Sequence, residues 1–383
     1  NGQYPGNAVD RRNAGGEKEI YHYLKENAPF LNGQIPEGET GIFYSRATRD
    51  VWGKDSMAED EYGTFLRGVE RVLFDCHIPY RFVPDLDFSY EKLKGLKVLL
   101  LPNAACLSEE HMEVIRRFVE NGGGLVASFR TSLYDEKGCR RPDFGLKDVL
   151  GCSFTGIVKD TRWDSYQKVR MAHPVFAGMD IERTEMIMNE EETLLCTKQK
   201  ADYDMAASYV PPIYNQPPEY AWIPEEETEY PTMLTGQYGK GRVVYFSNQT
   251  DKACFTNGHE DFINTYRNAV EWAAGGNFSF TVRAPESVHI SLTCDRKKGG
   301  RKVISFVNTT SGPFRPIRSL QPVYDLEVRL RGVSLKKAEI LREESRIEVE
   351  EEMVQEDREI VIRIPCLQEF SAVFLDTEEG REG

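Results

Sequence analysis

Arginine, tyrosine and histidine side chains are the residues of this sequence best suited to bind an anion or a polar substrate. Arg46 stands two positions after the apolar run GIFY, while Arg130 and Tyr134 follow the run LVASF. A guanidinium group pairs with phosphate or carboxylate, and a tyrosine hydroxyl adds a hydrogen bond. His173, in the segment AHPVFAG, is a candidate general base, although His-Pro is also common in turns. These four residues are therefore the ligand-binding candidates.

Cys106 is the candidate nucleophile that the strand pattern offers. It follows the run KVLLL in the segment PNAACLSEE, just before a predicted helix start, where a helix N-terminus can lower a thiol pKa. Cysteine is also a small apolar packing residue, and we favour that interpretation. The sequence contains no GxSxG elbow, no GxGxxG after a strand and no phosphate-binding GxxxxGK[ST] loop, so a serine hydrolase or dinucleotide site is disfavoured.

A segment rich in proline and aromatic residues, between positions 203 and 230, offers flat rings for contact with a sugar or another subunit. Packing within the domain is the alternative, and the sequence leaves both open. The oligomer-surface candidates are Tyr209, Tyr214, Tyr220 and Trp222.

Cysteine and histidine spacing argues against a metal centre. The eight cysteines include no CxxC pair, and the six histidines include no HxxxH or HExxH pair. We expect no metal, no cofactor, reduced thiols and a cytoplasmic location.

Glycoside hydrolysis uses two carboxyl groups at a defined separation, and 62 acidic residues cannot be sorted into such a pair without geometry.

Composition narrows the classes of partner. The 383 residues suffice for two or three domains, and the net charge of −14 repels the phosphate backbone, so nucleic-acid binding is not expected. No window approaches the roughly 18 uninterrupted apolar residues of a membrane span, so no membrane partner is expected.

The elements that must position the candidate side chains alternate between strand and helix up to residue 151. Unbroken apolar runs predict strands, and the i, i+3, i+4 spacing of apolar residues from Tyr62 to Cys76 predicts a helix. Ser108 is the predicted N-cap of a second helix. This alternation indicates a doubly wound parallel sheet, whose strand-end loops 45–50, 102–106 and 130–135 would line the ligand site. The predicted strands are 41–44, 80–83, 97–101, 125–129 and 242–247, with a closing helix at 260–274.

From residue 278 the apolar period changes from 3.6 to 2. The segments SVHISLTCDR and RKVISFVN predict one hairpin, and RIEVEEE and EIVIRI predict another, in a small all-β sandwich. The acidic cluster between 343 and 359 alternates with apolar residues, which favours a solvated strand face over a recognition tail.

Several of these segments together resemble a known family. GIFYSRATRD, GVERVLFDCHIPYRFVPD and LKVLLLPNAACLSEEHMEVIRRFVENGGGLVASFRTSLYDEKG are similar to the β-galactosidase trimerisation domain of family 42 glycoside hydrolases. The resemblance continues through YGKGRVVYFSN and NAVEWAAGG, and reaches the β domain in VNTTSGPFRPI. It implies a flavodoxin-like, class I glutamine amidotransferase-like fold and association around a three-fold axis. HPVFAGM and GKGRVVYF are also similar to ThuA-like proteins of the same fold.

The resemblance also implies where catalysis is absent. Enzymes of this type carry their catalytic glutamates on an N-terminal (β/α)8 barrel, and no barrel fits before Gly41. The amidotransferase nucleophile would follow the strand LVASF, at Phe129 to Thr131, with Arg130 as the nearest match and no thiol present.

We therefore expect three regions: a helix and linker leaving a missing barrel at 1–40, an amidotransferase-like domain at 41–276, and a β-sandwich at 277–383. The expected function is a non-catalytic accessory and oligomerisation region of a β-galactosidase-like glycoside hydrolase, with a homotrimer as the assembly and carbohydrate as the partner of the whole enzyme. The alternative is an autonomous ThuA-like hydrolase or sugar-binding protein that uses the strand-end loops.

Overall fold

The computed structural model describes residues 14–52, 61–159, 165–180, 185–212, 217, 219, 227–298, 300–310, 319–342, 346–354 and 357–379. Two compact units emerge from the internal contacts. We call Gly38–Phe278 the α/β unit, and Asn1–Glu37 together with Ser279–Gly383 the β unit. The described N-terminal residues up to Glu37 thus belong with the C-terminal strands.

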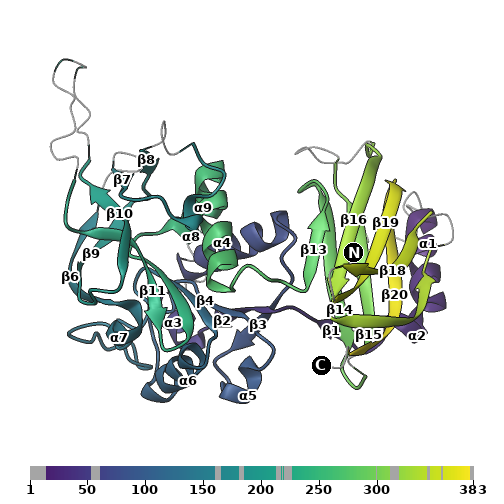
Figure 1. Cartoon of the computed structure of the whole chain (residues 1–383), viewed down its shortest axis with the longest axis horizontal. Coiled ribbons are helices and arrows are strands. Elements are labelled where there is room, and N and C mark those ends of the chain that lie inside the picture. The colour runs from purple at the N-terminus through teal and green to yellow at the C-terminus, as the bar shows by residue number, and fades with distance from the viewer. Residues whose placement is uncertain are drawn as a thin grey trace, which may run out of the picture. The chain divides into compact units, whose positions relative to one another are not determined.

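The α/β unit is built on one large sheet with the strand order β3-β2-β4-β5-β12-β11-β10-β7-β8 (Figure 1). Its strands are β2 (Thr40–Tyr44), β3 (Tyr80–Pro84), β4 (Val98–Leu101), β5 (Gly124–Ser128), β7 (Tyr166–Val169), β8 (Met186–Met188), β10 (Asp204–Val210), β11 (Pro231–Tyr238) and β12 (Gly241–Phe246). A separate antiparallel pair joins β6 (Cys152–Lys159) and β9 (Glu192–Lys198). The helices are α3 (Arg46–Trp52), α4 (Glu61–Asp75), α5 (Tyr90–Leu93), α6 (Glu109–Glu120), α7 (Lys147–Leu150), the 3₁₀ turn η1 (Pro174–Phe176), α8 (Thr250–Thr256) and α9 (Glu260–Ala273).

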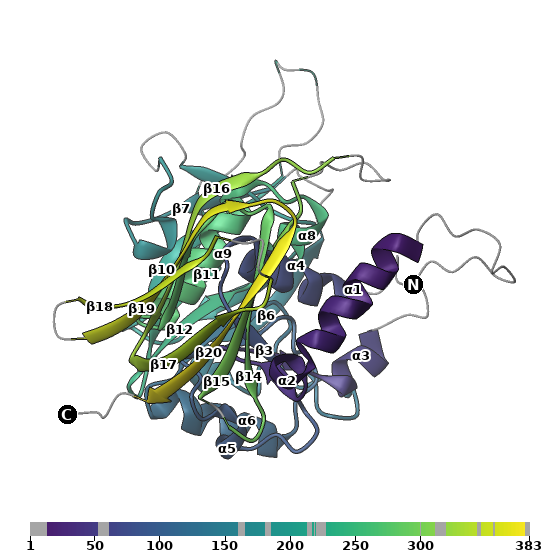
Figure 2. The ribbon, with the colours of Figure 1, turned by 90° about the vertical axis from the view of Figure 1, so that its right-hand side faces the viewer.

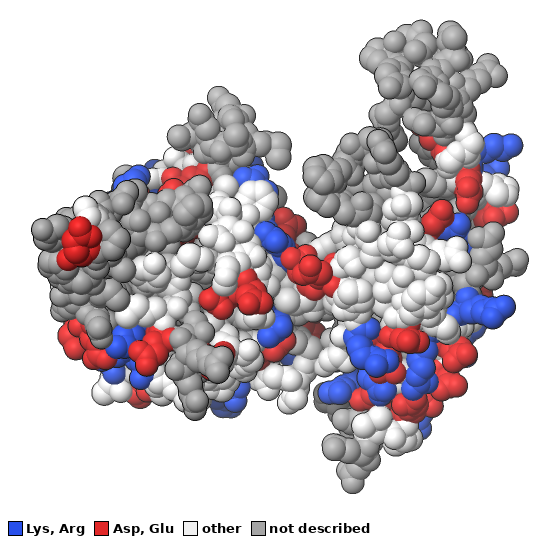
Figure 3. Space-filling view, turned by 90° about the horizontal axis from the view of Figure 1, so that it is seen from above, with Lys and Arg blue, Asp and Glu red and all other residues white. Residues whose placement is uncertain are grey.

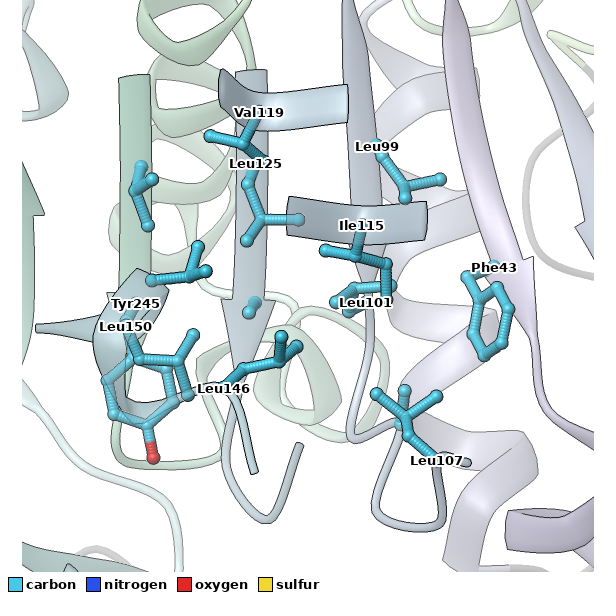
Figure 4. Close-up of a cluster of buried hydrophobic side chains, with 14 of the residues drawn as sticks. Phe43, Leu99, Leu101, Leu107, Ile115, Val119, Leu125, Leu146, Leu150 and Tyr245 are labelled. Carbon is cyan, nitrogen blue, oxygen red and sulfur yellow. The ribbon is translucent and has the colours of Figure 1, made fainter. Parts of the chain in front are cut away.

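Helices cover both faces of the central parallel strands, which explains why β4 is apolar and buried at every position. Along β4, Leu99 and Leu101 face a core that includes α6, while Val98 and Leu100 face a core that includes α4 and α9. Figure 1 shows α4 and α9 on one side of this sheet and α6 on the other. Figure 4 shows the first of these cores, where Ile115 of α6 lies over Leu101. The predicted cap is present, since the Ser108 hydroxyl accepts a hydrogen bond from the His111 backbone N–H at 3.2 Å.

The structure corrects the predicted sheet type. Strands β3, β2, β4, β5 and β12 run parallel, but β11, β10, β7 and β8 extend the sheet with antiparallel pairing. The sheet is therefore mixed. Short strands such as MIM at 186–188 carry too few residues to show a period in the sequence.

A second correction concerns the segment that follows β2. The sequence predicts a polar loop at residues 45–50, whereas Arg46–Trp52 is helix α3. The seven residues RATRDVW expose mostly polar side chains and bury only Thr48, so they show no apolar stripe.

The β unit consists of two antiparallel sheets that share a core. One has the order β1-β14-β15-β20-β17 and the other β13-β16-β19-β18. The strands are β1 (Gln34–Pro36), β13 (Phe280–Arg283), β14 (Val288–Asp295), β15 (Arg301–Asn308), β16 (Val323–Arg331), β17 (Val333–Ile340), β18 (Glu348–Val354), β19 (Asp357–Leu367) and β20 (Phe370–Glu379). Both predicted hairpins are present, as the antiparallel pairs β14–β15 and β18–β19.

Two helices, α1 (Ala14–Glu26) and α2 (Ala28–Leu31), lie against the outer face of the five-stranded sheet (Figure 2). The Tyr23 ring meets Phe370 at 5.1 Å between centroids, and Phe30 meets Phe374 at 4.8 Å. Strand β1 then pairs with β14, so the described N-terminal segment is an integral layer of this unit.

The outer face of the other sheet carries a network of ion pairs. Arg329 and Arg331 both bind Glu359, at 3.1 and 2.7 Å, and Arg363 binds Glu350 at 2.9 Å. Figure 3 shows acidic and basic side chains intermingled on the surface of this unit. The described acidic residues of β18 are mostly exposed on this strand, as the solvated-face interpretation predicted.

Candidate functional site at the carboxyl edge of the parallel strands

The crevice between β2 and β4 is closed by hydrogen bonds within the chain. The Ser45 hydroxyl donates to the Cys106 carbonyl at 3.1 Å, and it accepts the Thr48 backbone N–H at 3.0 Å. The Cys106 N–H in turn donates to the Thr48 hydroxyl at 3.0 Å. These backbone donors are the groups that an anion would need at this edge. Because they are already satisfied by side chains, this crevice is not an open phosphate cradle.

Cys106 is buried beneath α3 and is chemically quiet. Its side chain is 1% exposed, and burial raises the pKa of its thiol to about 11. A thiol that stays protonated at neutral pH is a poor nucleophile. The structure therefore supports the packing interpretation of this residue.

The turn after β5 has the strained backbone that nucleophile elbows use, but a phenylalanine occupies it. Phe129 has φ of +50°, a conformation that bulky residues rarely adopt. Its ring is fully buried and stacks on Phe65 at 5.8 Å. The strained residue is thus Phe129 rather than Arg130, and it has no group that could attack a substrate.

A buried pair of polar side chains, Ser128 and Asp251, lies next to this turn. The Ser128 hydroxyl donates to the Asp251 carboxylate at 2.5 Å and accepts the Asn103 backbone N–H at 2.8 Å. The second carboxylate oxygen accepts the Lys252 backbone N–H at 3.1 Å. Burial raises the pKa of Asp251 to about 7, although the Ser128 hydrogen bond opposes that rise. Ser128 and Asp251 are both 0% exposed, so this pair joins β5 to α8 and does not face a substrate.

Arg130 is the centre of a partly buried cluster at the same edge. Its guanidinium binds Glu61 at 2.9 Å and Glu192 at 2.7 Å, with the arginine side chain 11% exposed. The same group lies 4.6 Å from the centre of the Trp52 ring and 4.5 Å from that of Phe129. These contacts engage both terminal nitrogens of the guanidinium and two aromatic rings, so Arg130 ties α3, α4 and β9 together.

The other three predicted ligand residues lie apart from one another or are engaged in packing. Arg46 binds Asp85 at 2.7 Å, beyond the end of β3. The Tyr134 ring packs edge-on against Trp52 at 5.3 Å. His173 lies 4.9 Å from Trp272, at the end of α9 that adjoins the start of β12, which is the opposite edge of the sheet. Its Nδ1 accepts the Val175 N–H, and burial lowers the pKa of the ring.

Only part of the aromatic segment lies within the described residues. Tyr209 is 4% exposed within β10, so its side chain is not available at a surface. Tyr230 is 40% exposed. Tyr214, Tyr220 and Trp222 fall outside the residues that the structure describes.

Sequence reasoning missed Asp251 and Glu192, the two acids that organise this edge. Asp251 stands in the segment NQTDKACF, where a single acid next to lysine is typical of an exposed helix start. Glu192 ends the run NEEE, whose three glutamates look alike in the sequence, although the fold buries Glu190 and leaves the Glu192 side chain 15% exposed against Arg130. Only the fold reveals that each acid is enclosed.

Within the described ranges, no group of three histidine, cysteine or acidic side chains is placed to hold a metal ion. All eight cysteines, each a described residue, are outside any disulfide. No described helix combines the length and the apolar character that crossing a membrane requires.

Comparison with known proteins gives matches at the level of structure alone, since no family model and no curated protein matches the sequence. The α-L-fucosidase isoenzyme 2 from Paenibacillus thiaminolyticus superposes with a TM-score of 0.72 at 17% identity, over 98% of this chain and 54% of that chain. The β-galactosidase from Bacillus circulans sp. alkalophilus gives 0.62 at 13%, over 93% and 44%. The β-galactosidase from Rahnella sp. R3 gives 0.63 at 18%, over 97% and 45%. At these identities the likeness concerns the fold, and this chain spans about half the length of each.

Proposed function

We propose that this chain is a non-catalytic accessory and oligomerisation region of a β-galactosidase-like glycoside hydrolase of carbohydrate metabolism. The observation that supports this proposal most strongly is that the structural matches cover nearly all of this chain but only about half of each matched enzyme. Nearly all of this chain superposes on a fucosidase and on β-galactosidases, yet it accounts for only 54%, 44% and 45% of those three chains. In this proposal the catalytic carboxyl groups reside in the part of such an enzyme that this chain does not match.

Strand order, the shared core of the β unit and the sequence resemblance support the proposed domain types. The parallel strands, numbered along the chain, lie in the order 2-1-3-4-5, which is the flavodoxin-like order. The two antiparallel sheets of the β unit share one core, which supports a β-sandwich. The class I glutamine amidotransferase-like assignment rests on the sequence resemblance together with the strained turn after β5.

The residues at the carboxyl ends of the parallel strands, which we call the strand-end edge, support a role without catalysis. Phe129 occupies the strained turn, Cys106 is buried and protonated, and Asp251 is sealed against Ser128. These residues hold elements together and present no reactive group to solvent. The ThuA-like alternative requires Arg46, Arg130, Tyr134 and His173 to converge on one pocket. It is not favoured, because His173 lies at the opposite edge and Arg130 is enclosed by its own partners.

We further propose self-association as a homotrimer, with Tyr214, Tyr220 and Trp222 as the contact candidates, and a cytoplasmic location. Closed symmetric assembly needs a surface rich in aromatic residues and poor in charge. The unpaired thiols are compatible with a reducing compartment. Carbohydrate would be the partner of the whole enzyme.

Light scattering of the purified chain tests the assembly. The expected mass at micromolar concentration is three times the 43.8 kDa of one chain. The double variant Tyr220→Ser with Trp222→Ser should lower that mass, whereas Tyr324→Ser, at a tyrosine that is 63% exposed in the β unit, should not. A clean monomer of the unaltered chain would contradict the oligomerisation proposal.

A further inference from the structure

The β unit contains a cavity of about 630 Å³ that none of the candidate residues above lines. Its described wall comes from Glu19 of α1, from Arg342 and Arg346 between β17 and β18, and from the end of β19, the start of β20 and the turn that joins them. A volume of this size lies within the range of small-molecule sites in proteins, roughly 300–1,000 Å³. The polar residues of the wall are Glu19, Arg342, Arg346, Gln368 and Glu369.

Arg342 fixes the shape of this cavity. Its guanidinium lies 4.2 Å from the centre of the Phe370 ring and donates to the Phe370 carbonyl at 3.3 Å. It also binds Glu369 at 3.2 Å and Glu19 at 3.4 Å. The arginine side chain is only 17% exposed, so it is a positioned wall and not a mobile surface group. Phe370 is held from a second side by Tyr23 of α1.

Two further polar residues of the wall are available to a ligand. Arg346 and Gln368 are exposed, and neither side chain makes an ion pair or hydrogen bond with a residue that the structure describes. Arg346 offers several N–H donors, and the Gln368 amide offers both a donor and an acceptor. The carboxylates of Glu19 and Glu369 add acceptors.

The charge balance of the wall selects the kind of ligand. Two guanidinium groups face two carboxylates, so an anion would meet the glutamates and a cation would meet the arginines. A neutral molecule with many hydroxyl groups can use donors and acceptors together. Pro365 and Phe370 supply apolar surface for the C–H groups of such a molecule.

We propose that this cavity is a binding site for a neutral sugar, separate from the strand-end edge of the α/β unit. Arg346 and Gln368 contact the sugar hydroxyls, while Arg342 positions Phe370 as the apolar wall. The choice of sugars among neutral polyols rests on the proposed glycosidase-accessory function, and so does the choice of galactose, lactose and L-fucose as probes.

Cys366 provides a readout at the site itself, because this partly buried thiol lines the cavity. The whole chain would be alkylated with and without each sugar, and labelling of Cys366 followed by peptide mass spectrometry. Binding should slow the labelling of Cys366 and leave that of Cys139, an exposed thiol of the α/β unit, unchanged. The sugar concentration needed for protection should rise about tenfold in Gln368→Ala and in Arg346→Ala, because each loses hydrogen bonds to the sugar.

Both variants change exposed side chains, so folding is not at stake. The matched control is Arg296→Ala, which removes an exposed arginine elsewhere in the β unit and should leave protection unaltered. The proposal is overturned if no sugar protects Cys366, if protection is equal in the Gln368 variant, or if sulfate protects better than any sugar. A trimer in light scattering without protection of Cys366 would refute the sugar site while leaving the proposed accessory function intact.

Discussion

Replacing Asp251 by asparagine should change the unfolding free energy of the α/β unit by an amount that depends on pH. Relative to the unaltered chain, the variant should gain stability as the pH rises. Asp251 is fully buried, and its pKa rises from 3.8 to about 7 in the folded chain. Between these two values the unfolded state carries the charge and the folded state carries the proton. Folding stability therefore falls as pH rises through this window and is constant above it.

The size of the effect follows from the width of the window. Each pH unit between the two pKa values costs about 1.4 kcal/mol, so the unaltered chain loses about 3 kcal/mol between pH 5 and pH 8 from this residue alone. Asparagine does not titrate. Its single side-chain oxygen can keep the Ser128 hydrogen bond, but its NH2 group then faces the Lys252 backbone N–H. That cost is on the order of 1–3 kcal/mol and is the same at both pH values.

The quantity to measure is thus the difference in unfolding free energy between Asp251→Asn and the unaltered chain, at pH 5 and at pH 8. All four tryptophans, at positions 52, 163, 222 and 272, lie between Gly38 and Phe278, so denaturant unfolding followed by tryptophan fluorescence reports this unit. The difference should shift in favour of the variant by about 3 kcal/mol from pH 5 to pH 8. An equal difference at both pH values would refute the reasoning.

Two further substitutions test the packing at the same edge of the sheet. Arg130→Ala removes the partner of Glu61 and Glu192 and should lower the unfolding free energy of the α/β unit by about 3 kcal/mol. The control Arg49→Ala, at an exposed pair with its neighbouring aspartate, should leave it unchanged, and equal losses would contradict the cluster's role. Gly68→Ala should cost about 3 kcal/mol or more, since a Cβ there would lie 1.7 Å from the carbonyl oxygen of α8 at Asp251. Tolerance of that alanine in thermal unfolding would show that α4 and α8 can separate.

The central parallel strands could be located from the sequence because they are apolar runs covered by helices on both faces. The run KVLLL is an example, and β4 spans Val98–Leu101. Ser108 could be identified as a cap because side-chain capping is a local property. Helix α3 and the strand β1 were missed for the opposite reason. Their residues form no apolar period, and their conformation depends on contacts such as the pairing of Ile35 with Cys294.

The sequence could predict where the candidate side chains lie along the sheet, but not whether they are buried or which partners they bind. The expectation that Arg130 follows β5 at the strand-end edge was correct, yet its use as a structural tie depends on Glu192, which lies 62 positions away. The sequence leaves Tyr209 open between a surface contact and packing within the domain, and the structure resolves this in favour of packing because β10 lies inside the large sheet and buries it. Burial of a single side chain is decided by tertiary neighbours that local sequence does not encode.

Hydrolysis of aryl β-galactosides and aryl α-L-fucosides by the purified chain tests the central claim most directly. Such hydrolysis needs two carboxyl groups placed on opposite sides of one anomeric carbon. We expect no turnover above the buffer rate, because the acids at the strand-end edge, Asp251, Glu61 and Glu192, are sealed or paired with Ser128 and Arg130. Turnover that survives repurification and disappears when one acidic residue of this chain is changed to its amide would contradict the account.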